Sequence, residues 1–192
     1  MTRIISGSRG GRRLVMPPGD QTRPTSSKVR EALFSALASW SGGSSGPADI
    51  ALKGWAFCDL FAGSGAVGLE AASRGAAPVV LVEFSRRAVR TIEQNVAAVG
   101  LDVEVRRDVV EDVVRRSPPY PFDIVFLDPP YELAKGTVEA ILRDLVANGW
   151  LTAEGLVVLE RSSRESPPRW PDALGDTWEK RYGETVLYFA AG

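Results

Sequence analysis

The stretch Asp59-Leu60-Phe61-Ala62-Gly63-Ser64-Gly65-Ala66-Val67-Gly68 decides the fold of this 192-residue chain. An apolar run leads into it and a helical pattern follows, which is typical of the first strand-to-helix turn of an α/β sheet. Gly63 and Gly65 let a ligand approach the backbone, where a helix N-terminus presents unpaired N–H groups. The glycines fit Gly-x-Gly-x-x-Gly, and Glu83 ends the next predicted strand, where a carboxylate holds ribose hydroxyls.

Strands and helices alternate from residue 55 onward. The patterns predict strands over 55–60, 78–83, 103–107, 122–127 and 155–160, and helices over 66–74, 85–98, 109–116 and 137–147. The segments 177–182 and 185–189 have strand character without an intervening helix and predict a closing hairpin. The expected fold is therefore α/β: an open, mostly parallel, seven-stranded Rossmann-like sheet with helices on both faces and an antiparallel C-terminal strand.

The N-terminal region has a different pattern. Residues 1–15 predict a short β-hairpin that buries little surface, and an apolar stripe over 29–40 predicts a helix capped by Ser26 or Ser27. The Gly/Ser-rich segment 41–47 reads as a linker. We therefore expect an N-terminal hairpin and helix extension over 1–46 and a main domain over 47–192.

Basic residues are concentrated in this extension. Residues 1–30 carry seven Arg and Lys side chains against one acid, whereas the other 162 residues carry 16 basic and 23 acidic ones. A cationic arm on an acidic body is typical of a protein that contacts a polyanion at one end, and a solvated basic tail is the alternative.

The chain has no histidine and one cysteine, Cys58. This composition excludes an internal disulfide, histidine-dependent hydrolase chemistry and the usual zinc ligand sets, so no metal is expected. Cys58 lies within a predicted strand, which favours a buried, inert thiol. The longest apolar stretch, 76–82, is too short to cross a membrane, and no secretory signal is visible. The sequence therefore predicts a cytoplasmic protein without a membrane partner.

Two acidic residues bear on the identity of the ligand. Asp59 stands just before the glycine turn, where it would repel a pyrophosphate but suits the cationic sulfonium and amino-acid half of S-adenosylmethionine. We therefore expect S-adenosylmethionine as the cofactor. Asp108 follows the third predicted strand; its carboxylate either accepts from the adenine amino group or caps the next helix, and both roles stay open.

A second motif, Asp128-Pro129-Pro130-Tyr131, follows the apolar run 122–127. Two consecutive prolines fix two φ angles and supply carbonyls without N–H donors, and the first pushes Asp128 toward an extended conformation. A carboxylate and a carbonyl then lie side by side with an aromatic ring just beyond. This arrangement predicts a site that grips a planar amine.

These motifs, in this order, resemble those of class I S-adenosylmethionine-dependent methyltransferases that act on exocyclic or amide nitrogens. More narrowly, the chain resembles the RsmD family through four segments: Arg23-Pro24-Thr25, Val29-Arg30-Glu31-Ala32-Leu33-Phe34, Asp59 through Gly65, and Leu127 through Tyr131. That family methylates N2 of one guanine in bacterial 16S ribosomal RNA. The resemblance runs from Arg3 to about Glu160 and continues more loosely to the end.

The resemblance implies a role for each candidate residue. Catalysis falls to Asp128, Pro129 and Tyr131, and cofactor binding to Asp59, Phe61, Gly63, Ser64, Gly65, Glu83 and Asp108. The residues expected to contact RNA are Arg3, Arg9, Arg12, Arg13, Arg23 and Lys28; for Arg23 and Lys28, contact with the cofactor side stays open. The implied partner is 16S rRNA, in the small ribosomal subunit or an assembly intermediate, with S-adenosylhomocysteine as the product and a monomeric enzyme.

The expected mechanism follows from the poor nucleophilicity of guanine N2, whose lone pair is delocalised into the ring. Asp128 and the Pro129 carbonyl accept its two N–H bonds, which returns electron density to nitrogen, and Tyr131 stacks on the base. Positioning of this kind supplies roughly 7–11 kcal/mol. Asp128 is favoured as acceptor and orienter over general base, because a nearby cation keeps it ionised and weakly basic.

Three other readings stay open. The same proline turn serves methyltransferases that act on adenine N6 in DNA or on glutamine N5 in proteins. The Gly-x-Gly-x-x-Gly pattern also fits an NAD-dependent oxidoreductase, although this leaves Asp59 and the proline turn unexplained. The non-enzymatic reading is an RNA-binding module with a vestigial cofactor fold.

Overall fold

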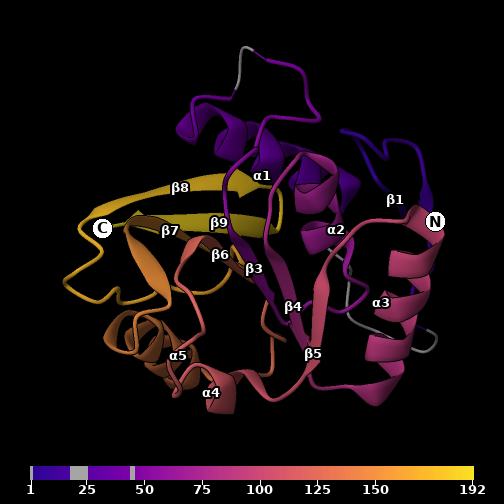
Figure 1. Ribbon diagram of the computed structural model, residues 1–192. Coiled ribbons are helices and arrows are strands. Elements are labelled where there is room, and N and C mark those ends of the chain that lie inside the picture. The colour runs from indigo at the N-terminus through magenta and orange to yellow at the C-terminus, as the bar shows by residue number, and fades with distance from the viewer. Residues whose placement is uncertain (1, 18–25, 44–45) are drawn as a thin grey trace.

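The computed structural model describes residues 2–17, 26–43 and 46–192, and its central element is a seven-stranded sheet (Figure 1). The strand order is β5-β4-β3-β6-β7-β9-β8. Its strands are β3 (Phe57–Leu60), β4 (Val79–Glu83), β5 (Glu104–Arg107), β6 (Phe122–Leu127), β7 (Leu151–Ser162), β8 (Asp176–Tyr182) and β9 (Thr185–Ala191).

The first five strands of the sheet, β5 to β7 in spatial order, pair in parallel, whereas β9 is antiparallel to both of its neighbours. The closing hairpin places β9 between β7 and β8, so β8 and not β9 forms the edge of the sheet. The strand order reverses between β3 and β6. In an open α/β sheet, ligands bind outside the C-terminal ends of the strands at such a reversal.

Helices cover both faces, as expected from the sequence. On one face lie α1 (Ser27–Trp40), α2 (Ala66–Ser73) and α3 (Arg86–Val99); on the other lie α4 (Val110–Val113) and α5 (Lys135–Ala147). Figure 1 shows α1 above the sheet and α4 and α5 below it. The predicted α/β architecture is confirmed.

Neighbouring residues of the central strands divide between the two cores because side chains alternate along a strand. Phe57 and Phe126 pack in the cluster that holds Leu33, Phe34 and other residues of α1. The adjacent Cys58 and Leu127 pack in the cluster that holds residues of α5. Cys58 is fully buried, and burial raises the pKa of its thiol well above the ordinary value, as expected for an inert cysteine.

Two elements differ from the predicted length by more than two residues. The strand expected over 155–160 runs from Leu151 to Ser162, because Leu151 pairs with Phe122 of β6 ahead of a register shift, although Ala153 and Glu154 that follow are exposed. The helix expected over 109–116 is a single turn, Val110–Val113. Ser26 caps α1 by accepting from the Val29 N–H at 3.2 Å.

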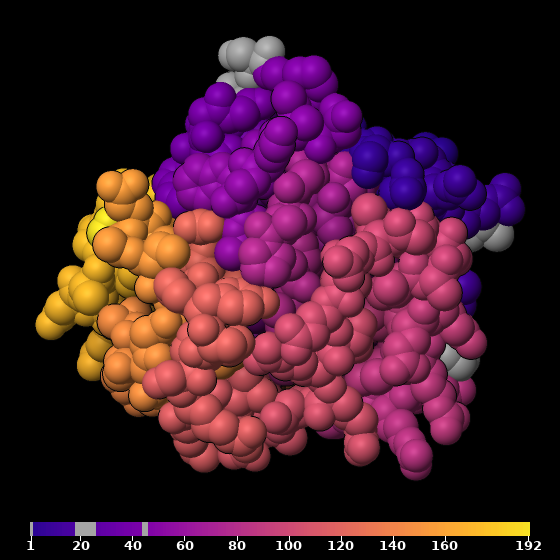
Figure 2. Space-filling model, viewed as in Figure 1, coloured from indigo at the N-terminus to yellow at the C-terminus, as the bar shows by residue number. Residues whose placement is uncertain are grey.

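The N-terminal hairpin pairs only two residues on each side, β1 (Thr2–Arg3) with β2 (Arg13–Leu14). The expectation that it buries little surface is wrong. Ile4 and Leu14 are buried against Leu69 of α2 and Val99 of α3. In Figure 2 the indigo N-terminal residues accordingly rest against the main body of the protein.

Glu70 of α2 is the polar anchor of this docking. It is fully buried and accepts from the backbone N–H groups of Ile5 and Ser6 at 2.6 and 3.0 Å. It also accepts from Arg74 Nε at 2.8 Å and lies 4.0 Å from Arg30 Nε. One buried carboxylate thus joins the N-terminal segment, α1 and α2. Among the described residues, no helix is long and apolar enough to span a membrane.

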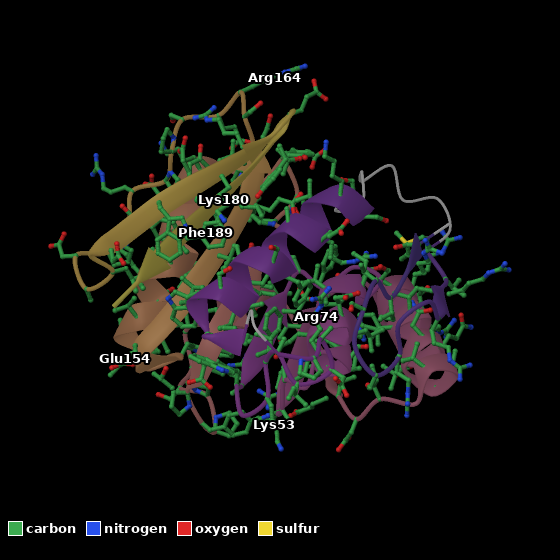
Figure 3. All side chains as sticks on the ribbon, turned by 90° about the horizontal axis from the view of Figure 1, so that it is seen from above. Lys53, Arg74, Glu154, Arg164, Lys180 and Phe189 are labelled. Carbon is green, nitrogen blue, oxygen red and sulfur yellow. The ribbon has the colours of Figure 1, made fainter. Side chains whose placement is uncertain are left out.

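We expect Glu70→Gln to lower the free energy of unfolding by roughly 3–5 kcal/mol, because the isosteric amide leaves two buried guanidinium groups without a counter-charge. Denaturant unfolding measures this loss. Glu154→Gln, on the exposed start of β7 (Figure 3), is the matched control and should change stability by less than about 0.5 kcal/mol. Equal stability of the two variants would contradict the anchoring role.

Candidate functional site

The turn after β3 has an unusual backbone conformation. Gly63 and Gly65 have φ angles of 57° and 77°, and Gly65 forms the N-cap of α2. Phe61, which is not a glycine, also has a positive φ of 66°. Left-handed backbone at a bulky residue costs energy and is concentrated at functional sites. Here it belongs to a residue that lines the cavity described below.

Gly68 does not line the cavity, and its lack of a side chain serves the packing of α2. A Cβ atom built there would lie 2.4 Å from Leu81 Cδ2 and 3.3 Å from Asp59 Oδ2. The third glycine of the pattern therefore allows α2 to pack closely on the sheet.

Glu83 ends β4 and holds the glycine turn. Its Oε2 accepts from the Gly63 N–H at 2.9 Å, and its Oε1 accepts from the Ser85 N–H at 2.8 Å. A carboxylate oxygen has more than one acceptor site, so Glu83 can hold the turn and still accept from a hydroxyl of a ligand.

Asp59 is 1% exposed, and its Oδ2 accepts from the Gly68 N–H at 2.8 Å. The pKa of this carboxyl group is raised from its ordinary value to about 8, mainly by burial and also by the charges of Asp128 and Glu83, which together outweigh the lowering effect of the Gly68 hydrogen bond. Three carboxyl groups from three strand ends thus share one site. A cation placed among them would relieve their repulsion, whereas a pyrophosphate would increase it.

These groups surround a cavity of about 500 Å³ at the ends of the strands on either side of the reversal between β3 and β6. A cavity of this volume can hold a molecule of the size of a cofactor. The predicted site residues that line it are Asp59, Phe61, Gly63, Ser64, Glu83, Asp128, Pro129 and Tyr131. Gly65 does not line it and acts through the backbone of the turn.

Asp108 lies beside the cavity and does not line it. Its carboxylate accepts from the Val109 N–H at 2.9 Å and pairs with Arg116 at 3.4 Å. The alternative that Asp108 caps the next helix is wrong, because α4 has Val109 as its N-cap and no side-chain cap bond. The adjacent Val109, Val110 and Glu111 line the cavity.

The Asp128–Tyr131 turn forms another wall. Asp128 is half-buried, Pro129 is buried, and Tyr131 is 49% exposed, so its ring is available to a large planar ligand. The Pro129 carbonyl accepts from Arg161 Nη1 at 3.2 Å. A carbonyl oxygen has two lone pairs, so this bond leaves room for a second donor.

Several lining residues have no predicted role. Phe84, 61% exposed, follows Glu83 at the cavity; an aromatic residue directly after the strand-end carboxylate was the sequence signal for it. Arg30 also lines the cavity, although it is 1% exposed, and its guanidinium donates to Arg3 O at 2.6 Å and Thr2 Oγ1 at 3.1 Å. Thr2, Met16 and Pro17 bring the N-terminal segment itself to the cavity.

The predicted RNA-contacting residues fall into distinct environments. Arg3, Arg12, Arg13 and Lys28 are exposed. Arg9 is half-buried, and its guanidinium donates to Val99 O at 2.8 Å and Gly100 O at 3.4 Å, where a cation stabilises the C-terminus of α3. Arg23 lies outside the described residues. No group of three or more potential metal ligands occurs within 2–17, 26–43 and 46–192.

The chain is similar in sequence to known proteins over most of its length. Residues 2–191 match the family described as Conserved hypothetical protein 95. Ribosomal RNA small subunit methyltransferase D of Escherichia coli K12 is 36% identical over 171 residues, which cover 88% of this chain and 79% of the relative. Putative rRNA methyltransferase YlbH of Bacillus subtilis is 32% identical over 187 residues, which cover 95% of each chain.

A solved structure, the putative methyltransferase yhhF from Escherichia coli, aligns with a TM-score of 0.83 at 30% identity and covers 98% of this chain and 96% of that one. The whole described sheet and its N-terminal extension thus have a counterpart of known architecture. The chain belongs to the Conserved hypothetical protein 95 family, the RsmD family of methyltransferases that its motifs resemble.

Proposed function

We propose that this protein transfers the methyl group of S-adenosylmethionine to N2 of a guanine in 16S ribosomal RNA. The observation that carries the proposal is the meeting of two motifs at one cavity: the Asp59–Gly68 turn on one side and the Asp128–Tyr131 turn on the other. The first suits the cofactor and the second suits a planar amine. The relatives named as rRNA small subunit methyltransferases support the choice of RNA as substrate.

The residues present fit S-adenosylmethionine better than a dinucleotide. Buried Asp59, whose pKa is raised by burial and by two neighbouring carboxylates, favours a ligand with positive charge. Glu83 at the end of β4 fits a ribose diol, and Phe84 with Val110 offers apolar surface for a flat ring. A diphosphate next to these carboxylates would be repelled, which argues against an NAD-dependent oxidoreductase. When bound, S-adenosylmethionine supplies an electrophilic methyl group.

The protein's own part is to hold and orient the amine. Asp128 accepts one N–H of guanine N2, the remaining lone pair of the Pro129 carbonyl accepts the other, and Tyr131 stacks on the base. Stacking contributes roughly 1–3 kcal/mol, comparable to the cost of extruding a base from its neighbours. Asp128 therefore acts as acceptor and orienter at the mouth of the cavity.

The pH dependence of cofactor binding tests the role of Asp59. With a pKa of about 8 in the free protein, the carboxyl group is mostly protonated at pH 7, and a bound cation lowers that pKa. We therefore expect binding to release a proton near pH 7, and affinity to rise with pH toward 8 and level off above it. Calorimetry in buffers of different ionisation enthalpy measures this release.

Asp59→Asn is the control for this experiment, because the isosteric amide keeps an acceptor for the Gly68 N–H but cannot titrate. Comparison with wild type at each pH cancels the titration of the ligand's own amino group. Identical proton release by wild type and Asp59→Asn would contradict the assignment.

Replacement of Asp128 tests the catalytic turn. We expect Asp128→Ala to lower kcat by at least about 1,000-fold, because aligned positioning accounts for much of the barrier reduction, while the affinity for S-adenosylmethionine, to which Asp59 and Glu83 still contribute, falls far less than kcat. Asp128→Asn, which keeps one acceptor oxygen, should retain more activity than the alanine variant. Methyl transfer to small ribosomal subunits and equilibrium cofactor binding are the two readouts; full activity of Asp128→Ala would overturn the mechanism.

We propose that residues 1–46 guide the RNA to this cavity, with residues 47–192 as the methyltransferase domain. Exposed Arg3, Arg12, Arg13 and Lys28 supply the charge, and Thr2, Met16 and Pro17 connect the same segment to the cavity wall. Arg9 contributes by fixing the segment on α3. The proposed substrate is 16S rRNA within the small ribosomal subunit or an assembly intermediate, and the proposed enzyme is cytoplasmic and monomeric.

Neutralising the arm tests this surface without unfolding it, whereas its deletion would expose the core residues around Ile4 and Leu14. We expect Arg12→Gln/Arg13→Gln to weaken RNA binding and to reduce the slope of log K against log salt by about 1.5, since two phosphate contacts are lost. Arg115→Gln/Arg143→Gln, exposed on the α4–α5 face, is the matched control. Equal salt slopes for both double variants would contradict the proposal.

A further inference from the structure

Arg161 is a buried arginine to which the roles above assign no function. It lies near the end of β7, two residues beyond Leu159, which pairs with Leu127 at the end of β6. Its side chain is 6% exposed. Buried arginine is uncommon unless its charge and its donors are paired, so its partners indicate what it is for.

Its guanidinium group binds the turn after β6 through three carbonyls. Nη1 donates to Pro129 O at 3.2 Å and Pro130 O at 3.1 Å, and Nη2 donates to Leu133 O at 3.4 Å. The two prolines have no N–H groups with which to bind neighbouring backbone. Arg161 therefore supplies from β7 the donors that the proline turn lacks.

Glu165 fixes the guanidinium in place. Its Oε2 accepts from Arg161 Nη2 at 2.7 Å and from Nε at 2.9 Å, and a turn closed by the Glu165 N–H to Ser162 O brings the two residues together. The planar fork of arginine can bind the carboxylate along one edge and the carbonyls along the other. A lysine cannot reproduce both sets of bonds.

The next arginine along the chain has a different environment. Arg164 extends away from the body of the protein (Figure 3), and its ion pair with Glu184 is exposed. The burial and the carbonyl contacts are therefore specific to Arg161 and do not follow from the basic composition of this loop.

We propose that Arg161, held by Glu165, is a positioning residue for methyl transfer: it fixes the direction of the Pro129 carbonyl so that its second lone pair meets the amine. This inference rests on the proposed function of the turn. In a two-proline turn the carbonyls face the substrate amine. The turn's own backbone has few N–H groups, so it makes few hydrogen bonds that could hold these carbonyls in place.

The test compares Arg161→Met and Arg161→Lys with Arg181→Met. Arg181 lies in the same row of the sheet, since both arginines are in register with Val186, and its ion pair with Glu179 is exposed. We expect Arg161→Met to lower kcat about 100-fold, the effect of misplacing a reacting group by about 1 Å. Cofactor affinity should stay within about twofold, and Arg161→Lys should lose about 10-fold. Arg181→Met should match wild type.

A second readout does not depend on activity. The Leu133 N–H donates to Pro130 O at 2.9 Å, and we expect hydrogen exchange in residues 131–134 to be faster in Arg161→Met but unchanged in Arg181→Met. Glu165→Gln should show a smaller increase in the hydrogen-exchange rate of these residues. This variant provides the test if Arg161→Met does not fold.

The outcomes separate this inference from the proposed function. Absence of methyl transfer by wild type would overturn the proposed function. The hydrogen-exchange rates of residues 131–134 would still show whether Arg161 holds the turn. Wild-type kcat in Arg161→Met, unchanged exchange at 131–134, or a fall in cofactor affinity as large as the fall in kcat would overturn the positioning role.

Discussion

The structure depends on how three carboxyl groups are accommodated at one edge of the sheet. Asp59, Glu83 and Asp128 come from the ends of β3, β4 and β6, and the strand order brings them to a single cavity. Backbone N–H groups of Gly63, Ser85 and Gly68 offset part of this charge. The negative charge that is not offset favours a cation in the cavity. This preference links the fold to the chemistry of a sulfonium cofactor.

The second constraint is the rigidity of the Asp128–Tyr131 turn, which we propose holds the methyl acceptor. A two-proline turn has little conformational freedom, but it also has few backbone donors with which to hold its position. The neighbouring strand β7 supplies Arg161, which binds three carbonyls after β6, and Glu165 just beyond β7 holds the guanidinium. Sheet pairing between β6 and β7 thus contributes to the geometry of the turn that we propose binds the amine.

Much of the fold could be predicted from the sequence because its signals are local. Apolar runs that alternate with helical patterns predicted the parallel strands, and the absence of a helix between 177–182 and 185–189 predicted the terminal hairpin. The start of β7 was missed because Thr152 and Glu154 are polar there, whereas Leu151 before them pairs with Phe122 of β6. The Asp59 and Asp128 turns could be predicted from the sequence because the residues that define each turn are consecutive.

What the sequence did not reveal depends on contacts between distant residues. Glu70 binds the N–H groups of Ile5 and Ser6 across 65 and 64 positions, so the docking of the hairpin has no local signature. Arg9 illustrates the same point, since its charge suggested RNA whereas its guanidinium binds the end of α3. Arg161 reaches its turn across 32 positions, and nothing in the sequence around it distinguishes it from Arg164.

The most direct test of the central claim is to identify the methylated product. The protein and isotope-labelled S-adenosylmethionine are incubated with small ribosomal subunits from cells that lack this methylation, with DNA and protein substrates in parallel, and the labelled nucleoside is identified by mass spectrometry. We expect N2-methylguanosine at a single position of 16S rRNA. Label in N6-methyladenosine, in glutamine or in no substrate would contradict it.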